Sequence, residues 1–290
     1  MTRLAFAIPA GRLRHHACAI AALSLLAAGC SRTPPIQLEP TWTATGLLDP
    51  ESLALSEDGS VLYVSNVDGV ASAKDGKGSI SRLRRDGTML EAAWIDGLHG
   101  PKGIAVRDGR LYVSDIDTLV EIDIASAAIV KRHAVMDAQF LNDVAIAGDG
   151  SVLVSDSSAG RIHVLRDGQV SPWRDDPLLA RVNGLLPQAD RQIAAPMEGR
   201  LLAIDWKTRA IAPLAKGLGK ADGIGALAEG GFVVSDWPGR LFHVDAQGRK
   251  SILLDLRKQE HTINDLLLGG DALYLPNWEP GTITAYRIKR

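Results

Sequence analysis

The chain has 290 residues, of which 46% are hydrophobic, and its formal net charge is −2 at pH 7. No block of Lys and Arg stands out and aromatic residues make up only 5%, which argues against nucleic-acid binding. No window shows sustained helical periodicity, so the alternating helices of a parallel α/β sheet are not expected.

The first 29 residues are predicted to be a lipoprotein signal peptide. A basic start that includes Arg3 and Arg12 precedes an uncharged, mostly apolar run over 17–29, which is too short to span a bilayer. The run ends Leu-Leu-Ala-Ala-Gly-Cys, which resembles a bacterial lipobox with Cys30 as the residue to be lipidated. Several acyl chains on Cys30 would anchor the protein stably to a membrane. The alternative is an ordinary secretory signal followed by an incidental cysteine.

The segment 30–45 is expected to be the lipidated cysteine and an extended tether, which could also supply a closing outer strand. Ser31 follows the cysteine, and the absence of Asp there resembles lipoproteins that face the periplasm from the outer membrane. Cys18 lies inside the signal, so the mature chain has no cysteine pair and no disulfide framework. No second apolar run is long enough to span a bilayer.

From about residue 46 onward, six segments share one pattern around a polar residue. The distances between successive polar residues are 51, 40, 41, 39 and 42 positions. A repeat of this length with polar atoms at one register is typical of a ring-shaped fold that aims six side chains at a common axis. The six residues are Glu51, Lys102, Asn142, Asn183, Asp222 and Asn264.

Each polar residue is followed by an apolar stretch, a turn and a second apolar stretch, which is the pattern of a β-hairpin. In the third unit these are 144–147, a Gly-Asp-Gly turn at 148–150, and 152–156. A third strand follows in most units and a fourth in many. Four strands per unit of about 40 residues predict an all-β fold, a six-bladed β-propeller over 46–290 with four-stranded blades. The insertion between residues 66 and 79 is expected to be a surface loop over one face of the ring.

Two registers of the repeat have different predicted roles. The residues that close the hairpins are expected to cap turns; they are Asn66, Asp115, Asp156, Asp236 and Asn277. The first register contains no Ser and includes Glu51 and Lys102, neither of which is a favoured turn former. A functional role is therefore favoured for the first register.

The first register offers oxygen ligands for a cation. Glu51 and Asp222 supply carboxylates, and Asn142 and Asn183 supply amide carbonyls, a set that suits Ca²⁺ or another hard divalent cation. No His or Cys joins the set, which argues against a dedicated zinc or copper site. A bound dication can polarise an ester or lactone carbonyl and acidify a water. The sequence contains no nucleophile elbow, Walker loop or dinucleotide fingerprint.

The register and the repeats resemble the SMP-30/gluconolactonase family of six-bladed calcium-dependent propellers, with paraoxonases and strictosidine-synthase-like proteins as relatives. The resemblance covers roughly Gly46 to Arg290. It implies a calcium ion held, in blade order, by Glu51, Asn142, Asn183 and Asp222. It also implies that Asp222 orients or deprotonates a water.

Two positions depart from the family pattern. Phe140 stands where sugar-lactonase members have an Arg that contacts substrate, and Lys102 stands where paraoxonases have a His implicated in catalysis. Lys102 could neutralise Glu51 and weaken or replace the metal, or it could bind a carboxylate on a ligand. His99 precedes Lys102 by three residues and could reach the mouth of the channel, while Asn264 is expected to line the channel as a spectator.

The sequence therefore predicts a membrane-tethered, divalent-cation-dependent hydrolase of lactones or related esters acting on a small molecule. Asp222 and Lys102 are the candidate catalytic residues, and Lys102, Phe140, Asn264 and His99 the candidate channel residues. The alternative is a non-catalytic propeller that binds a ligand or a protein and has a structural ion or a hydrogen-bonded plug on its axis.

Overall fold

The computed structural model describes residues 1–2 and 36–290. The predicted signal peptide, the lipobox cysteine Cys30 and most of the predicted tether lie outside the described residues, so the predictions made for them stay predictions. Residues 36–290 form one compact unit. Within the described residues, no helix has the length and apolar character needed to cross a membrane.

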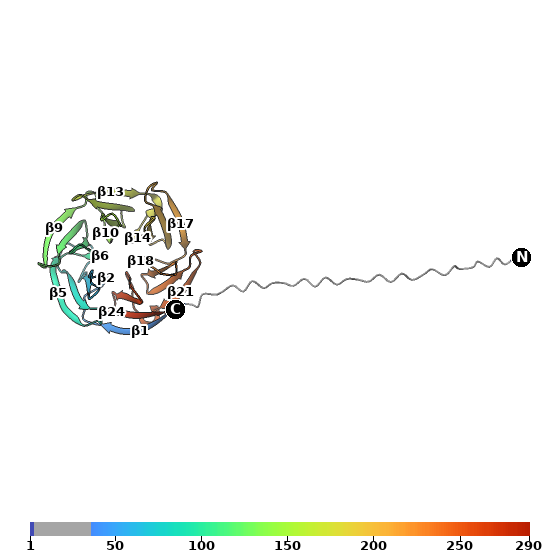
Figure 1. Ribbon diagram of the computed structural model, residues 1–290, viewed down its shortest axis with the longest axis horizontal. Coiled ribbons are helices and arrows are strands. Elements are labelled where there is room, and N and C mark those ends of the chain that lie inside the picture. Colours follow the sequence, from blue (N-terminus) through green and yellow to red (C-terminus); the bar gives the residue numbers. More distant parts are fainter. Residues whose placement is uncertain (3–35) are drawn as a thin grey trace. The chain divides into compact units, whose positions relative to one another are not determined.

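Six four-stranded antiparallel sheets are arranged around a common axis, which confirms the predicted six-bladed β-propeller (Figure 1). Blade 1 consists of β2 (Pro50–Leu55), β3 (Val61–Asn66), β4 (Gly78–Arg84) and β5 (Met89–Leu98), counted outward from the axis. The innermost strands of neighbouring blades contact one another, so the residues at their starts surround the axis.

The next four blades repeat this order. Blade 2 is β6 (Pro101–Arg107), β7 (Arg110–Asp115), β8 (Thr118–Asp123) and β9 (Ala128–Ala134); blade 3 is β10 (Leu141–Ile146), β11 (Val152–Asp156), β12 (Arg161–Arg166) and β13 (Gln169–Asp175). Blade 4 is β14 (Val182–Pro187), β15 (Arg191–Pro196), β16 (Arg200–Asp205) and β17 (Ile211–Lys216); blade 5 is β18 (Ala221–Ala226), β19 (Phe232–Asp236), β20 (Arg240–Val244) and β21 (Lys250–Asp255). The 3₁₀ helices η1 (Pro177–Leu179) and η2 (Arg257–Gln259) lead into blades 4 and 6.

The sixth blade combines both ends of the described unit. Its strands, from the axis outward, are β22 (Leu267–Gly269), β23 (Ala272–Asn277), β24 (Thr282–Lys289) and β1 (Gln37–Ala44). The outer strand β1 pairs antiparallel with β24, from Gln37 opposite Lys289 to Ala44 opposite Ile283. The sequence analysis expected that 30–45 would be a tether that could also supply a closing outer strand, and residues of this segment do supply that strand.

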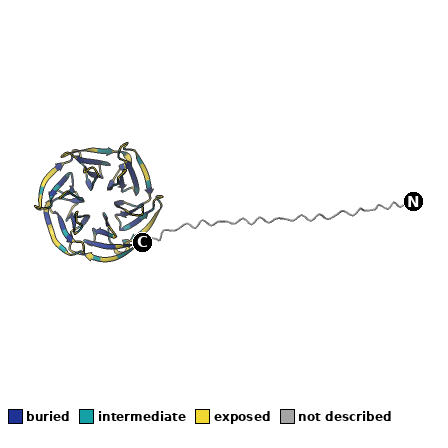
Figure 2. Cartoon of the chain, in the orientation of Figure 1, coloured by how far each residue is buried: buried dark blue, intermediate teal, exposed yellow. Residues whose placement is uncertain are grey.

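The core lies between neighbouring blades, and exposed residues gather on the outer strands (Figure 2). The strand β11 is buried along its whole length, whereas β9 exposes most of its side chains. An inner strand meets another blade on each face, and this explains its short continuous apolar runs, such as Val152-Leu153-Val154.

The insertion between β3 and β4 contacts blade 2 at the end where β6 begins. Its residue Ala71 accepts a hydrogen bond from Lys102 Nζ at 2.9 Å, and Gly76 N donates to His99 Nδ1 at 3.1 Å. Lys74 forms an ion pair with Asp117 at 2.6 Å. The loop thus lies against the end of the propeller that carries the repeated polar residues.

Candidate functional site

The six repeated polar residues stand at the beginning of the six innermost strands or, in blade 6, just before the strand, and we call them the axial ring. All are buried although all are polar. Their exposed fractions are 7% for Glu51, 3% for Lys102, 6% for Asn142, 3% for Asn183, 4% for Asp222 and 3% for Asn264.

A break in strand pairing sets each ring residue apart from the regular sheet. In blade 1, Pro50 pairs with Asn66 and the next pair is Leu53 with Val64, so Glu51 and Ser52 fall in an irregular step. The same step occurs at the ring position in blades 2 to 5. In blade 6 an isolated bridge, Ile263 to Asn277, takes the place of the ladder. Such bulges re-aim side chains and recur next to active sites.

The residues that close the hairpins hold the loops that lead into the ring. Asp115 Oδ1 accepts hydrogen bonds from the backbone N–H groups of His99 at 2.9 Å and Gly100 at 2.8 Å. Asp156 accepts in the same way from Phe140 N at 3.0 Å. For these two residues the predicted capping role is confirmed, and the cap fixes the backbone two residues before each ring residue.

Buried serines beside these caps satisfy groups that the bulges leave unpaired, and sequence reasoning missed them. Ser155 Oγ accepts from Asp143 N at 2.9 Å, and Ser114 Oγ donates to the carbonyl oxygen of Asn142 in the next blade. The available signal was a Ser before Asp or Asn at the end of the second strand in four of the six blades. These serines are Ser65, Ser114, Ser155 and Ser235.

Replacing Ser155 by Ala is expected to destabilise the protein by about 1–3 kcal/mol, because the partly buried Asp143 N–H would lose the acceptor that Ser155 Oγ provides. The free energy of unfolding from urea titration checks this. Ser158→Ala, at an exposed position three residues along, is the matched control and should change stability by less than about 0.5 kcal/mol. Equal effects of the two substitutions would contradict the role given to Ser155.

Four carboxyl groups near the axis share one electrostatic environment. Burial raises the pKa of Glu51 to about 8; the charge of Lys102 opposes this shift and that of Asp265 adds to it. Burial, followed by the charges of Glu51, Asp265 and Asp143, raises the pKa of Asp222 well above its ordinary value. Burial likewise raises the pKa of Asp265 to about 6, and burial, followed by the charge of Asp265, raises the pKa of Asp143 well above its ordinary value. The folded protein therefore disfavours full ionisation of this group.

Asp143 and Asp265, which directly follow two ring residues, connect neighbouring blades. Asp143 Oδ2 accepts from Leu185 N in blade 4 at 2.6 Å, and the Asp265 carboxylate accepts from the Ser52 hydroxyl in blade 1. Sequence reasoning missed both, although Asn-Asp occurs at the ring in blades 3 and 6 only. With their oxygens engaged in this way, they add negative charge beside the ring and leave Glu51 and Asp222 as the candidate ligands.

The amide group of Asn142 is oriented so that its oxygen atom remains for a ligand. Ser157 Oγ donates its one proton to Val182 O at 2.6 Å. It must therefore accept from Asn142 Nδ2, which lies 3.2 Å away, so Asn142 Oδ1 does not bond to Ser157. Asn183 lies beside Asp222 and lowers its pKa, which partly opposes the shift caused by burial.

Asn264 provides the clearest sign of a missing partner. Its Oδ1 atom is buried and has no hydrogen-bond partner among the described residues. A buried polar atom is normally paired. Two carboxylates, three amide oxygens and an excess of negative charge fit a hard divalent cation. Across residues 36–290 no three His, Cys, Asp or Glu side chains are placed to hold a metal by themselves, so the amide oxygens would be needed.

Lys102 is fixed by contacts other than Glu51. Its Nζ donates to Ala71 O at 2.9 Å and Gly100 O at 2.8 Å, and it lies 4.3 Å from the centre of the Phe140 ring. Burial lowers the pKa of Lys102, and the charge of Glu51 opposes this. Two of the three ammonium protons thus hold the insertion loop and the backbone beside the ring.

A pocket of about 570 Å³ opens beside Asn142, between blades 3 and 4. Phe140, Ala180 and Met197 supply apolar walls, and Ser157 is already engaged with backbone. Arg181 lines the same pocket, is exposed, and precedes Asn183 by two residues. Arg181 and Phe140 are therefore equivalent, because each stands two residues before the ring residue of its blade. The sequence analysis did not identify this equivalence.

Comparisons with known proteins bear on the fold. No protein-family model matches the chain, and a search of curated proteins finds no significant match. Among solved structures, a gluconolactonase from Xanthomonas campestris is 17% identical with a TM-score of 0.65, covering 87% of each chain. A streptogramin B lyase is 11% identical with a TM-score of 0.65, covering 88% of this chain and 98% of that one.

A third neighbour is a catalytically inactive variant of virginiamycin B lyase from Staphylococcus aureus, solved with quinupristin. It is 12% identical with a TM-score of 0.61, covering 87% of this chain and 99% of that one. At these identities the likeness shows the fold alone. At that level the resemblance to gluconolactonase-like propellers is confirmed.

Proposed function

We propose that the chain is a lactonase-type hydrolase whose axial ring binds a divalent cation, Ca²⁺ by the chemistry of its ligands. One observation carries the proposal: the ring offers uncompensated carboxylates and an unpartnered amide oxygen, Asn264 Oδ1, and it adjoins a pocket of about 570 Å³. Glu51, Asn142, Asn183 and Asp222 are the proposed ligands, and Asn264 is added to them as a fifth.

The proposed mechanism gives each side chain a defined task. A cation bound to the ring would polarise an ester carbonyl and lower the pKa of a nearby water. Asp222 would orient the water and accept its proton. The pKa of Asp222 is raised by burial and by its acidic neighbours in the metal-free protein, and a bound cation would lower it. Asn183 lowers the pKa of Asp222 and so favours its ionised form. Lys102 keeps the insertion loop in place against blade 2 through its hydrogen bond to Ala71 O. Its ammonium group also contacts the phenyl ring of Phe140 and so positions that side chain.

The fold neighbours include a lyase as well as a lactonase, so the fold does not distinguish elimination from hydrolysis. The residues at the axial ring are therefore compared with each reaction. The lyase variant with quinupristin was made catalytically inactive by replacing a histidine with alanine. No histidine belongs to the axial ring of this chain, and His99 Nδ1 is occupied by the backbone N–H of Gly76. These observations favour hydrolysis over a histidine-dependent elimination.

The experiment that tests the proposal is a panel of lactones and aryl esters assayed with Ca²⁺ and with EDTA. Turnover that EDTA removes and Ca²⁺ restores is expected. Absence of any EDTA-sensitive turnover would leave the second candidate, a binding module with a structural ion. The observation that favours that second candidate is that Val70, Met136 and Trp237, on three loops at the end of the propeller that carries the ring, are exposed apolar side chains.

Within the panel, substrates with apolar substituents are expected to be preferred over polyhydroxylated sugar lactones, because Phe140, Ala180 and Met197 give the pocket apolar walls. Phe140→Ala should lower kcat/KM for an apolar lactone about tenfold, through lost apolar contact. Steady-state kinetics check this. Ser158→Ala, in the same pocket, is the control and should leave the ratio of the two substrates unchanged; a wild-type preference for the sugar lactone would refute the pocket assignment.

We propose in addition that Cys30 is lipidated and anchors the protein at the periplasmic face of the outer membrane. The support is the Leu-Leu-Ala-Ala-Gly-Cys sequence ending at Cys30 and the Ser that follows it. Cys30→Ser should move the protein from the membrane fraction to the soluble fraction of the cell envelope. An unchanged membrane fraction would contradict lipid anchoring.

A further inference from the structure

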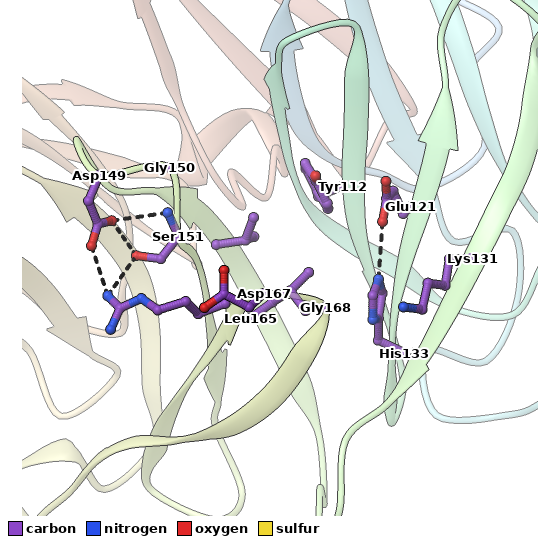
Figure 3. A pocket seen from close by; sticks show the side chains of 12 residues that line it. Tyr112, Glu121, Lys131, His133, Asp149, Gly150, Ser151, Leu165, Asp167 and Gly168 are labelled. Carbon is purple, nitrogen blue, oxygen red and sulfur yellow. Dashed lines mark hydrogen bonds and ion pairs between the residues drawn. The ribbon is translucent and has the colours of Figure 1, made fainter.

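Two pockets lie at the end of the propeller opposite the axial ring, beside the turn between β10 and β11. The first, of about 370 Å³, lies between blades 2 and 3 (Figure 3). Three of its charged groups already have partners: His133 Nε2 lies 3.1 Å from Glu121 Oε2, and Asp149 accepts from Ser151.

The second pocket, of about 380 Å³, lies on the other side of the same turn, between blades 3 and 4. Trp173 on β13 and Trp206 after β16 form its wall, with ring centres 5.4 Å apart at an interplanar angle of 70°. Trp206 Nε1 donates to Gln188 O at 2.8 Å, which fixes the indole. The wall is therefore a rigid aromatic surface that solvent reaches.

One cation of this pocket lacks a counterion. Arg209 lies over the Trp173 ring, with its guanidinium carbon 4.2 Å from the ring centre, and its Nη1 is buried without a hydrogen-bond partner among the described residues. Arg166, the other cation, is paired with Asp149 at 2.8 Å. The guanidinium of Arg209 thus has, beside the aromatic wall, a buried N–H group without an acceptor in the described part of the chain.

The backbone of Arg209 is held in an unfavourable conformation. Its φ is 62°, in the left-handed region that most non-Gly residues avoid, and its N–H donates to Asp205 O at 3.0 Å. Burial, followed by the like charge of Arg166, lowers the pKa of Arg209, while Asp149 and Asp205 oppose the shift. An anion placed between the two guanidinium groups would relieve their repulsion.

We propose that this pocket binds a small aromatic carboxylate, with the carboxylate on Arg209 and the ring against Trp173 and Trp206. A bidentate or charge-assisted bond supplies the specificity for the anion, and the indoles supply the preference for a planar ring. The pocket volume lies in the lower part of the range of small-molecule sites. The site is about 20 Å along the strands from the ring and does not depend on the proposed hydrolysis.

The test is binding of benzoate and indole-3-acetate to the full chain, measured by calorimetry and by NMR shifts of the Trp173 and Trp206 indole N–H signals. Saturable binding that benzamide and acetate do not reproduce is expected, because each lacks one of the two recognised features. Arg209→Met, which keeps the apolar stem, should weaken binding about 10- to 100-fold.

Arg82→Met is the matched control, because Arg82 also stacks on an indole, Trp94, but already pairs with Glu91. It should leave the affinity for benzoate unchanged. The wild-type protein alone also tests the proposal, even if the Arg209 variant fails to fold. Benzoate at about 10 mM would nearly saturate a site with a Kd of about 1 mM. If the indole N–H signals of the wild type do not shift at that concentration, the proposal is overturned. Equal affinity of wild type and Arg209→Met would overturn it as well.

Discussion

Replacing Asp222 by Asn should stabilise the metal-free protein and at the same time abolish its response to Ca²⁺. The folded state disfavours the ionised Asp222, because burial and three acidic neighbours raise its pKa. An amide of the same shape removes that cost. It also removes one of the two charges that the ring offers to a cation, and a cation site that loses a charged ligand loses most of its affinity.

The substitution raises the stability of the metal-free protein and removes the stabilisation by Ca²⁺. One series of thermal-unfolding measurements, with EDTA and with Ca²⁺, detects both changes. With Ca²⁺ at about a hundredfold over its Kd, the wild type should gain about 2.7 kcal/mol. For a domain of this size that corresponds to a rise in Tm of about 5–11 °C. The variant should unfold at a higher temperature than the wild type in EDTA and should show no rise with Ca²⁺.

Asp167→Asn is the matched control, because Asp167 is exposed in the turn between β12 and β13, at the far end of blade 3. It should keep the full calcium response. A wild-type Tm that does not change between EDTA and Ca²⁺ would refute the ring as a cation site. A calcium response of normal size in Asp222→Asn would refute the assignment of Asp222.

Without a cation, the stability of the protein should fall as pH rises from about 4.5 to 8. Glu51 has a folded-state pKa of about 8 against an ordinary value of 4.5, so the folded state binds more protons than the unfolded state throughout this window. The free energy of unfolding then decreases with pH, by a total on the order of 5 kcal/mol for this group. Asp265, with a pKa of about 6 against 3.8, contributes in the same direction over the lower part of the window.

Urea titrations in EDTA at pH 5, 6, 7 and 8 measure this slope. Glu51→Gln should make it markedly shallower, because the amide does not titrate. Since the cation competes with protons for Glu51 and Asp222, the stabilisation by Ca²⁺ should grow with pH over the same window. Stability that stays flat or rises with pH in EDTA would contradict the electrostatic description of the ring.

The repeat was sufficient to predict the fold because each hairpin is a local event with its own turn. The placement of the closing strand was harder: β1 at Gln37–Ala44 pairs with β24, at the other end of the chain, and nothing local in 37–44 specifies that partner. The six ring positions were identified because they recur at one register.

The supporting groups were missed because their roles appear only when two blades are adjacent. Ser114 in blade 2 donates a hydrogen bond to the carbonyl oxygen of Asn142 in blade 3. Asp143 in blade 3 accepts a hydrogen bond from Leu185 N in blade 4. The orientation of Lys102 depends on the path of the insertion loop, since its ammonium binds Ala71 O. A repeat in the sequence marks equivalent positions, but contacts between blades depend on which neighbours the fold supplies.

The most direct test of the central claim is a crystal structure of the protein grown with Ca²⁺, examined for anomalous scattering at the axial ring. The account predicts one cation with oxygens of Glu51, Asn142, Asn183 and Asp222 at about 2.3–2.6 Å. It also predicts that Asn264 Oδ1 points toward that cation. Water alone at the ring, or the Lys102 ammonium bound between Glu51 and Asp222, would contradict it.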